Sequence, residues 1–231
     1  MGGWWRVKGF SYHKILSMKR LKDWFLSKLS QIIPIAWHTL LEVGCGNGSR
    51  SIWLASQCKS LFAIDPDQFL IQIAKERNII NATFALWEAQ NLDYENQYFD
   101  IVIFSLSFHH IPKQDMKKSI DEAMRVVKKW WYIVFFEPTE EGSFFHAEIL
   151  FDACDGDERM AKRDAYDAIM SNHKLKHFIE FYDETIFQFD SVEDFIESLN
   201  PRKNLENIST FLIQNNFLLN ADRRVTISQP L

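Results

Sequence analysis

Residues 40–48 read Leu-Leu-Glu-Val-Gly-Cys-Gly-Asn-Gly. An apolar run over 39–43 leads into this cluster of glycines, and residues 49–57 then have the composition of a helix. The order predicts a buried strand, a tight turn and a helix, because glycine lets the backbone bend sharply and approach a ligand without a Cβ in the way. The stretch therefore predicts a nucleotide-like ligand at the end of the strand.

The alternation of strand and helix continues after this turn. Apolar runs predict strands over 61–64, 83–86, 101–104 and 130–136, with helices beginning at Asp67 and covering 113–127. Residues 178–189 and 224–228 are expected to add two more strands. This pattern predicts an α/β fold with a doubly wound, mainly parallel, seven-stranded sheet, because strands that alternate with helices are joined by right-handed crossovers.

The flanks of this core are expected to be largely helical. Apolar residues at steps of three and four predict an N-terminal helix over 15–29, and residues 143–172 and 205–214 also have helical composition. Ser191 to Asp194 resembles a capping box that opens a helix over 192–199. We expect one domain over 1–231, with an N-terminal helical cap (1–38), a ligand-binding core (39–138), a helical insert or lid (139–190) and C-terminal helices with a strand (191–231).

Composition excludes several other classes of protein. The net charge is −5 and no long Lys/Arg run is present, so a nucleic-acid partner is not expected. No apolar run approaches the roughly 20 residues that span a bilayer. Cys45, Cys58 and Cys154 are scattered, so they predict neither a disulfide framework nor a metal site and fit a reducing compartment. We expect a cytoplasmic protein whose oligomeric state the sequence leaves open.

Two acidic residues sharpen the prediction of the ligand. Glu42 lies two residues before Gly44, where a carboxylate would repel a pyrophosphate but suits a ligand that carries an ammonium and a sulfonium group. Asp65 follows Gly44 by 21 residues, at the expected end of the second strand, where an acidic side chain accepts hydrogen bonds from ribose hydroxyls. Asp65 alone could simply cap a helix, but the glycine turn favours the ribose role. At a strand end, Asp65 is expected to contribute to ligand binding and hardly to folding stability.

These motifs resemble one known family. Glu42 to Gly48, Asp65, and the segments 87–92 and 99–102 look like the class I methyltransferases, closest to their small-molecule "type 11" branch. The resemblance covers about residues 38–138. It implies that S-adenosylmethionine is the cofactor, that S-adenosylhomocysteine is the product, and that a methyl group passes by direct displacement to an O, N or C atom of a small-molecule acceptor.

The resemblance also implies which residues bind the cofactor. Glu42 would orient the amino group of its methionine part, Asp65 would bind the ribose, and Glu88 would accept the adenine amino group. The full expected set is Glu42, Gly44, Cys45, Gly46, Asp65, Pro66, Glu88, Ala89 and Ser105. One departure is Trp87, where the family has glycine; it is either an ordinary core or surface aromatic residue or a wall beside the adenine.

A catalytic base is needed only if the acceptor must lose a proton. The candidates are His109, His110 and His146, although at least one of the adjacent pair could merely bond loop backbone. Residues 105–108 lack both the Asp/Asn-Pro-Pro-aromatic motif of base-amino methyltransferases and the Pro-Cys nucleophile of cytosine-carbon enzymes. Small molecules are therefore favoured as acceptors over protein side chains and nucleic acids.

Two other functions compete with catalysis of methyl transfer. The first is a non-catalytic module that binds an S-adenosyl ligand and acts through a partner protein. The second is a nicotinamide dehydrogenase, which Glu42 disfavours together with Ser49, because the dinucleotide fingerprint requires Gly or Ala at that position.

Overall fold

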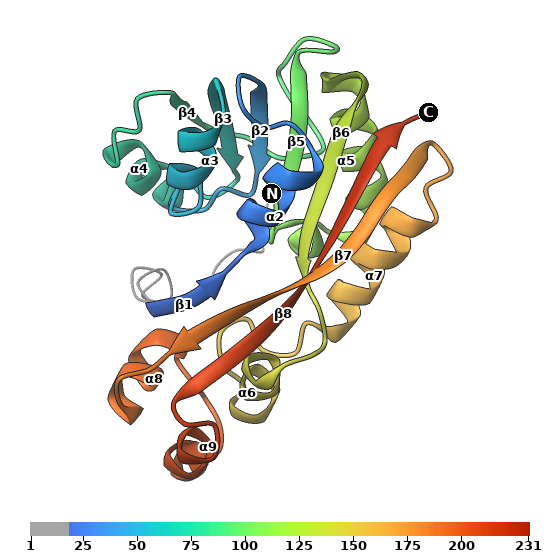
Figure 1. Ribbon diagram of the computed structural model, residues 1–231. Helices are drawn as coiled ribbons and strands as arrows, with labels where there is room; N and C mark the ends of the chain where they lie inside the picture. Colours follow the sequence, from blue (N-terminus) through green and yellow to red (C-terminus); the bar gives the residue numbers. More distant parts are fainter. Residues whose placement is uncertain (1–18) are drawn as a thin grey trace. The chain divides into compact units, whose positions relative to one another are not determined.

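The computed structural model describes residues 19–231 (Figure 1). Its strands are β1 (Lys19–Asp23), β2 (Thr39–Val43), β3 (Ser60–Asp65), β4 (Ala82–Leu86), β5 (Phe99–Ser105), β6 (Val127–Pro138), β7 (Leu175–Gln188) and β8 (Leu218–Pro230). Its helices are α2 (Phe25–Ile32), α3 (Ser51–Gln57), α4 (Gln68–Glu76), α5 (Lys113–Val126), α6 (Ser143–Phe151), α7 (Arg159–Met170), α8 (Val192–Leu199) and α9 (Ile208–Gln214), with 3-10 turns η1 (Phe108–His110) and η2 (Leu205–Asn207).

The strands form one mixed sheet in the hydrogen-bonded order β1-β7-β8-β6-β5-β2-β3-β4. The five strands from β6 to β4 are parallel, and β8 pairs antiparallel with β6. The predicted doubly wound, mainly parallel fold is thus confirmed. The sheet has one strand more than the expected seven, because β1 pairs antiparallel with the end of β7 over 185–188.

Helices cover both faces of the parallel strands (Figure 1). Leu40 and Ile101 belong to one hydrophobic cluster with residues of α2, α3 and α4. Leu41 and Val102, one position along, belong to the opposite cluster with residues of α5 and α7. Successive strand residues point to opposite faces, so strands buried on both faces must be apolar throughout. The continuous apolar runs in the sequence reflect this arrangement.

The N-terminal helix is shorter than the sequence predicts. Of the expected helix over 15–29, residues 15–18 lie outside the described part, residues 19–23 form β1, and the helix begins at Phe25. Leu21 is exposed, whereas Phe25 and Leu29 are buried. The periodicity was misleading for β1 because pairing with β7, more than 160 residues away along the chain, overrides a local helical pattern.

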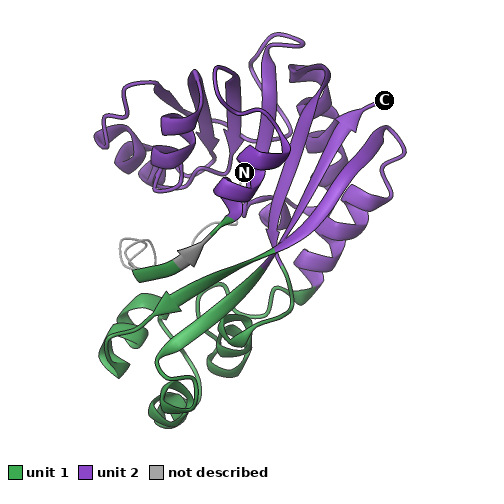
Figure 2. Ribbon diagram, in the orientation of Figure 1, with its two compact units in different colours: residues 1–24, 139–159, 183–222 green, residues 25–138, 160–182, 223–231 purple. Residues whose placement is uncertain are grey.

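The chain divides into two compact units (Figure 2). The larger unit comprises residues 25–138, 160–182 and 223–231 and contains the parallel strands. Of the described residues, the smaller unit comprises 19–24, 139–159 and 183–222. It has its own core, in which residues of α6, α8 and α9 surround fully buried Phe151 and Phe195. Ser191 caps α8 by accepting a hydrogen bond from the Asp194 N–H, as the sequence predicts. Within residues 19–231, no helix is both long and apolar enough to cross a membrane.

Candidate active site

The glycine turn connects β2 to α3 at the carboxyl edge of the parallel strands. Gly44, Gly46 and Gly48 all have positive φ, which L-residues with a side chain rarely adopt. A Cβ on Gly44 would lie 2.0 Å from the Cβ of Ser107, because the segment after β5 packs directly on the turn. A Cβ on Gly46 would meet no described atom within 4 Å, so open space lies beside this part of the turn.

Glu42 lies fully buried at the end of β2. Its Oε2 accepts a hydrogen bond from the hydroxyl of Ser51, while Oε1 has no hydrogen-bond partner among residues 19–231. Burial raises the pKa of Glu42 to about 7, although the Ser51 hydroxyl and the charge of Arg50 act in the opposite direction. A buried acceptor with one unsatisfied oxygen is costly, and a ligand that donates a hydrogen bond there would offset the cost.

Asp65 connects the end of β3 to the glycine turn. Its Oδ2 accepts from the Gly46 N–H at 2.8 Å, and its Oδ1 accepts from the Asp67 N–H at 2.9 Å. Burial raises the pKa of Asp65, and these two hydrogen bonds together with the charge of His110 lower it. Each oxygen keeps a further lone pair for a ligand hydroxyl. Asp65 therefore also holds the turn, contrary to the expectation that it contributes little to stability.

The remaining expected cofactor residues follow the ends of neighbouring strands. Pro66 is exposed directly after β3, and Ser105, at the end of β5, is buried close enough to Glu42 to lower its pKa. Glu88 and Ala89 follow β4; Glu88 is exposed and accepts from Gln90, whereas Ala89 is buried. Because β2, β3, β4 and β5 are parallel, these positions share one edge of the sheet, where ligands of doubly wound folds bind.

Trp87 packs against the side chain of Tyr94. Their ring centroids are 5.0 Å apart and the rings are nearly perpendicular. The indole is partly buried beside the hydrophobic cluster that includes Ala89. This contact gives Trp87 a packing role in the larger unit and places it next to the pair formed by Glu88 and Ala89 in the chain.

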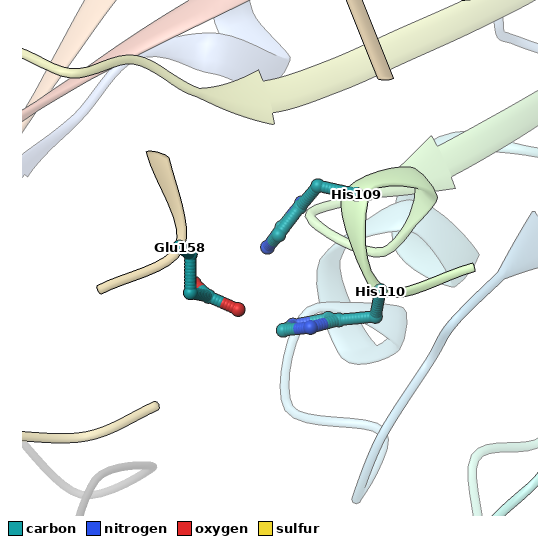
Figure 3. A group of neighbouring side chains, drawn as sticks. All are labelled: His109, His110 and Glu158. Carbon is teal, nitrogen blue, oxygen red and sulfur yellow. The ribbon is translucent and has the colours of Figure 1, made fainter. Parts of the chain in front are cut away.

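Two of the three candidate histidines lie together in η1, directly after β5. The rings of His109 and His110 have centroids 4.0 Å apart and are tilted by 42° (Figure 3). His109 is buried, and its Nδ1 is hydrogen-bonded to Oε2 of Glu137. His110 is partly buried and close enough to Asp65 to lower its pKa. His146 belongs to the smaller unit, where it is exposed on α6 with its ring 5.7 Å from Phe211.

Sequence reasoning missed Glu137. It is buried at the end of β6 and accepts hydrogen bonds from the N–H groups of Ser107 (3.1 Å), Phe108 (2.9 Å) and His109 (3.1 Å). Burial raises the pKa of Glu137, but the charge and hydrogen bond of His109 and the backbone N–H groups outweigh it, so the pKa is lowered. The available signal was an acidic residue that ends a wholly apolar strand at the ligand edge.

The known proteins that this chain is similar to are methyltransferases. Residues 40–130 match a family model described as a methyltransferase domain. An uncharacterized methyltransferase of Anoxybacillus flavithermus is 22% identical over 70% of this chain and 66% of its own length. A demethylmenaquinone methyltransferase of Clavibacter sepedonicus is 24% identical over 53% of this chain and 50% of its own length. The chain thus spans about two thirds or less of these relatives.

Solved structures share the fold. A putative methyltransferase of Bacillus halodurans has a TM-score of 0.64 at 16% identity, covering 89% of this chain and 99% of that one. A SAM-dependent methyltransferase of Aquifex aeolicus has a TM-score of 0.58 at 13% identity, covering 88% of each chain. At such low identity these likenesses establish the fold alone.

Proposed function

We propose that this chain is a class I S-adenosylmethionine-dependent methyltransferase and that it transfers a methyl group from S-adenosylmethionine to a small-molecule acceptor. The observation that carries the proposal is the turn from Glu42 to Gly48 together with Asp65. Among residues 19–231, it combines open space at Gly46, a buried carboxyl with one unsatisfied oxygen and a second carboxylate held by the turn itself. An ammonium group and a ribose are the ligand parts that such acceptors suit.

Each part of the cofactor has candidate residues at the sheet edge. Glu42 would accept from the amino group of the methionine part, directly or through water, and the backbone at 44–46 would border that part. Asp65 would accept from the ribose hydroxyls, with Pro66, Glu88 and Ala89 around the adenine. Ser105 would complete the amino-acid end. When bound, S-adenosylmethionine supplies a methyl group that is already activated by its positive sulfur.

The chain's own contribution to the reaction is alignment and exclusion of water. An acceptor atom held in line with the methyl–sulfur bond reacts as if at very high concentration, and a dry pocket favours dispersal of the sulfonium charge. A small molecule is supported as acceptor by the net charge of −5 and by the segment 105–108, which lacks the motifs of nucleic-acid methyltransferases.

Ligand binding tests this proposal directly. Calorimetry with S-adenosylhomocysteine should give a Kd in the micromolar range or below, and NAD should not bind. Binding of NAD without binding of the S-adenosyl ligand would contradict the proposal. The alternative, a non-catalytic module that binds the ligand and acts through a partner protein, is separated by a second experiment: the protein is incubated with methyl-labelled cofactor and a small-molecule extract, and only a catalyst gives a labelled product.

The role expected for residues 139–190 as an insert or lid stays a prediction. These residues contribute α6 to the core of the smaller unit and α7 to a core cluster of the larger one. A deletion of 143–172 would therefore remove buried Ala165 and Ile169 and disturb the fold as well as any lid. Substitutions of single exposed residues in α6 are the better test of acceptor selection.

A further inference from the structure

We propose that His109 is the catalytic base of this chain, that Glu137 is the residue that positions it, and that the acceptor is therefore a protic nucleophile. By this we mean a hydroxyl, a thiol or a nitrogen that carries a proton which it must lose on methylation. The inference rests on the proposed methyl transfer and names its class of acceptor.

The ionisation state of the Glu137 carboxyl determines which nitrogen of His109 can act as a base. Its side chain is buried, three successive backbone N–H groups, of Ser107, Phe108 and His109, donate to its two oxygens, and Nδ1 of His109 lies against Oε2. Three backbone donors, whose direction is fixed, stabilise the ionised carboxylate, which only accepts hydrogen bonds. Glu137 is therefore an anion, which agrees with the lowered pKa of its carboxyl group.

The tautomer of His109 follows from the ionised state of Glu137. Because the carboxylate can only accept, Nδ1 of the ring must carry the proton that bonds Oε2 of Glu137. In the neutral imidazole the lone pair then lies on Nε2, the nitrogen opposite the carboxylate. A buried carboxylate also stabilises the imidazolium that forms when Nε2 takes up a proton, so this pair has the arrangement of a base with its orienting group.

The segment that carries His109 is held in place by packing and by a hydrogen bond. Phe108 is fully buried, and its ring is in edge contact with Phe104 and Phe135, 5.1 Å from each. The hydroxyl of Ser107 donates to the Val43 carbonyl at 2.6 Å, beside the glycine turn. The two residues before His109 are thus fixed by ring packing and a hydrogen bond, and the contact with Glu137 orients the ring itself.

The pair formed by His109 and Glu137 lies near the residues assigned to the cofactor. Ser107 packs on Gly44, and His110, whose ring contacts that of His109, lies close enough to Asp65 to affect its ionisation. Gly44 and Asp65 are the residues assigned to the methionine and ribose parts of the cofactor. His109 therefore lies at the same sheet edge as the proposed site of transfer, where the acceptor must approach.

The reaction step follows from this arrangement. The lone pair of the acceptor oxygen, sulfur or nitrogen forms a bond to the methyl carbon, and the bond from that carbon to sulfur breaks with its electron pair left on sulfur. The acceptor's proton passes to Nε2 of His109, and the resulting imidazolium is paired with Glu137 until it releases the proton to water. An acceptor without such a proton, for example a tertiary amine or a thioether, would not need the pair.

The tautomer can be measured without knowing the acceptor. Long-range proton–nitrogen NMR of histidine-labelled protein at about pH 8 should show His109 with a protonated Nδ1 and an unprotonated Nε2. The signal is assigned by its loss in His109→Asn, with His173→Asn, an exposed histidine of the same unit, as the matched control. In Glu137→Gln the amide nitrogen can donate to Nδ1, so the proton should move to Nε2, whereas Glu137→Asp keeps the carboxylate and should keep Nδ1 protonated.

Transfer from labelled cofactor into a small-molecule extract supplies the second readout. We expect the label on an atom that carried a proton. The rate of transfer should fall about 10²- to 10⁴-fold in His109→Asn and by a smaller factor in Glu137→Gln, with partial recovery in Glu137→Asp. The Kd for S-adenosylhomocysteine should stay within about threefold of the parent value in all three variants. A ring protonated on Nε2 in the parent, or a label on an atom that carried no proton, would overturn the inference. If S-adenosylhomocysteine binds and nothing is labelled, the base role and catalysis both fail; if it does not bind, the proposed function fails while the tautomer result stands independently.

Discussion

Replacement of Asp65 by alanine should weaken cofactor binding and folding at the same time. The carboxylate accepts two backbone hydrogen bonds, at 2.8 and 2.9 Å, and each such bond to a charged acceptor is worth about 1.5–3 kcal/mol. Burial of the carboxylate, which raises its pKa, offsets part of this gain. We therefore expect a net loss of about 2 kcal/mol of unfolding free energy, or about 4–8 °C in unfolding temperature for a chain of this size.

In Asp65→Ala we expect a larger loss of affinity for S-adenosylhomocysteine than a general weakening of the fold would explain. Without the acceptor for the ribose hydroxyls, binding of S-adenosylhomocysteine should weaken by about 1.5–3 kcal/mol, or roughly 10- to 150-fold. Asp67→Ala is the matched control, because Asp67 caps α4 by accepting from the Phe69 and Leu70 N–H groups. Its loss should cost about 1 kcal/mol of stability and leave affinity nearly unchanged. Calorimetry and thermal unfolding of both variants measure the two effects; equal affinity losses in both, or none in Asp65→Ala, would refute the ribose assignment.

Three further predictions concern the glycine turn and Glu42, which precedes it at the end of β2. Gly44→Ala places a Cβ 2.0 Å from Ser107 and should cost about 3 kcal/mol or more of unfolding free energy, as measured by urea denaturation. The added Cβ of Gly46→Ala meets no described atom within 4 Å, so this substitution should cost only about 1–2 kcal/mol of unfolding free energy, through the positive φ. The methyl group would occupy the open space beside the turn, so the affinity for S-adenosylhomocysteine should fall at least tenfold. A larger loss of stability than in Gly44→Ala would contradict the packing argument. The pKa of the Glu42 carboxyl rises from 4.5 to about 7 on folding. The unfolding free energy should therefore be highest below about pH 4.5, where the carboxyl is neutral in both states. It should fall by some 3 kcal/mol in all as the pH rises through about 7, because the folded protein then buries a charge. Relative to Glu42→Gln, the parent should therefore lose stability between about pH 5 and pH 8, and parallel curves would show that Glu42 is ionised throughout.

The fold was predictable from sequence where the signal is local. The turn at 44–48 and the wholly apolar strands depend on near neighbours in the chain, and β2 begins and ends where the sequence predicts. Asp67 and Ser191 cap helices through bonds that span two or three residues, so their sequence signatures are reliable. The strand β1 was missed because its partner lies far away in the chain.

The candidate site was only partly predictable for the same reason. Glu42 and Asp65 stand at fixed distances from the glycines, so the motif identifies them. Glu137 has no such spacing from His109; the two meet because β5 and β6 are parallel neighbours that end at the same edge. The contact of Ser107 with Gly44 likewise follows from the pairing of β2 with β5. Pairing of strands, and not the motif, decides which side chains meet there.

The pairing of β6 with β8 has a consequence for synthesis of the chain. Residues 133–138 of β6 are covered on one side by residues 223–228 of β8, which the ribosome adds only after the whole stretch 139–222. At 5–20 residues per second, several seconds pass in which the apolar edge formed by Ile133 to Phe136 has no permanent neighbour. Such an edge can pair with another nascent chain. Expression at lower temperature, or with chaperones that hold this edge, should therefore improve the soluble yield of the full chain, whereas a fragment that stops before residue 223 should aggregate even though it contains every residue assigned to the cofactor.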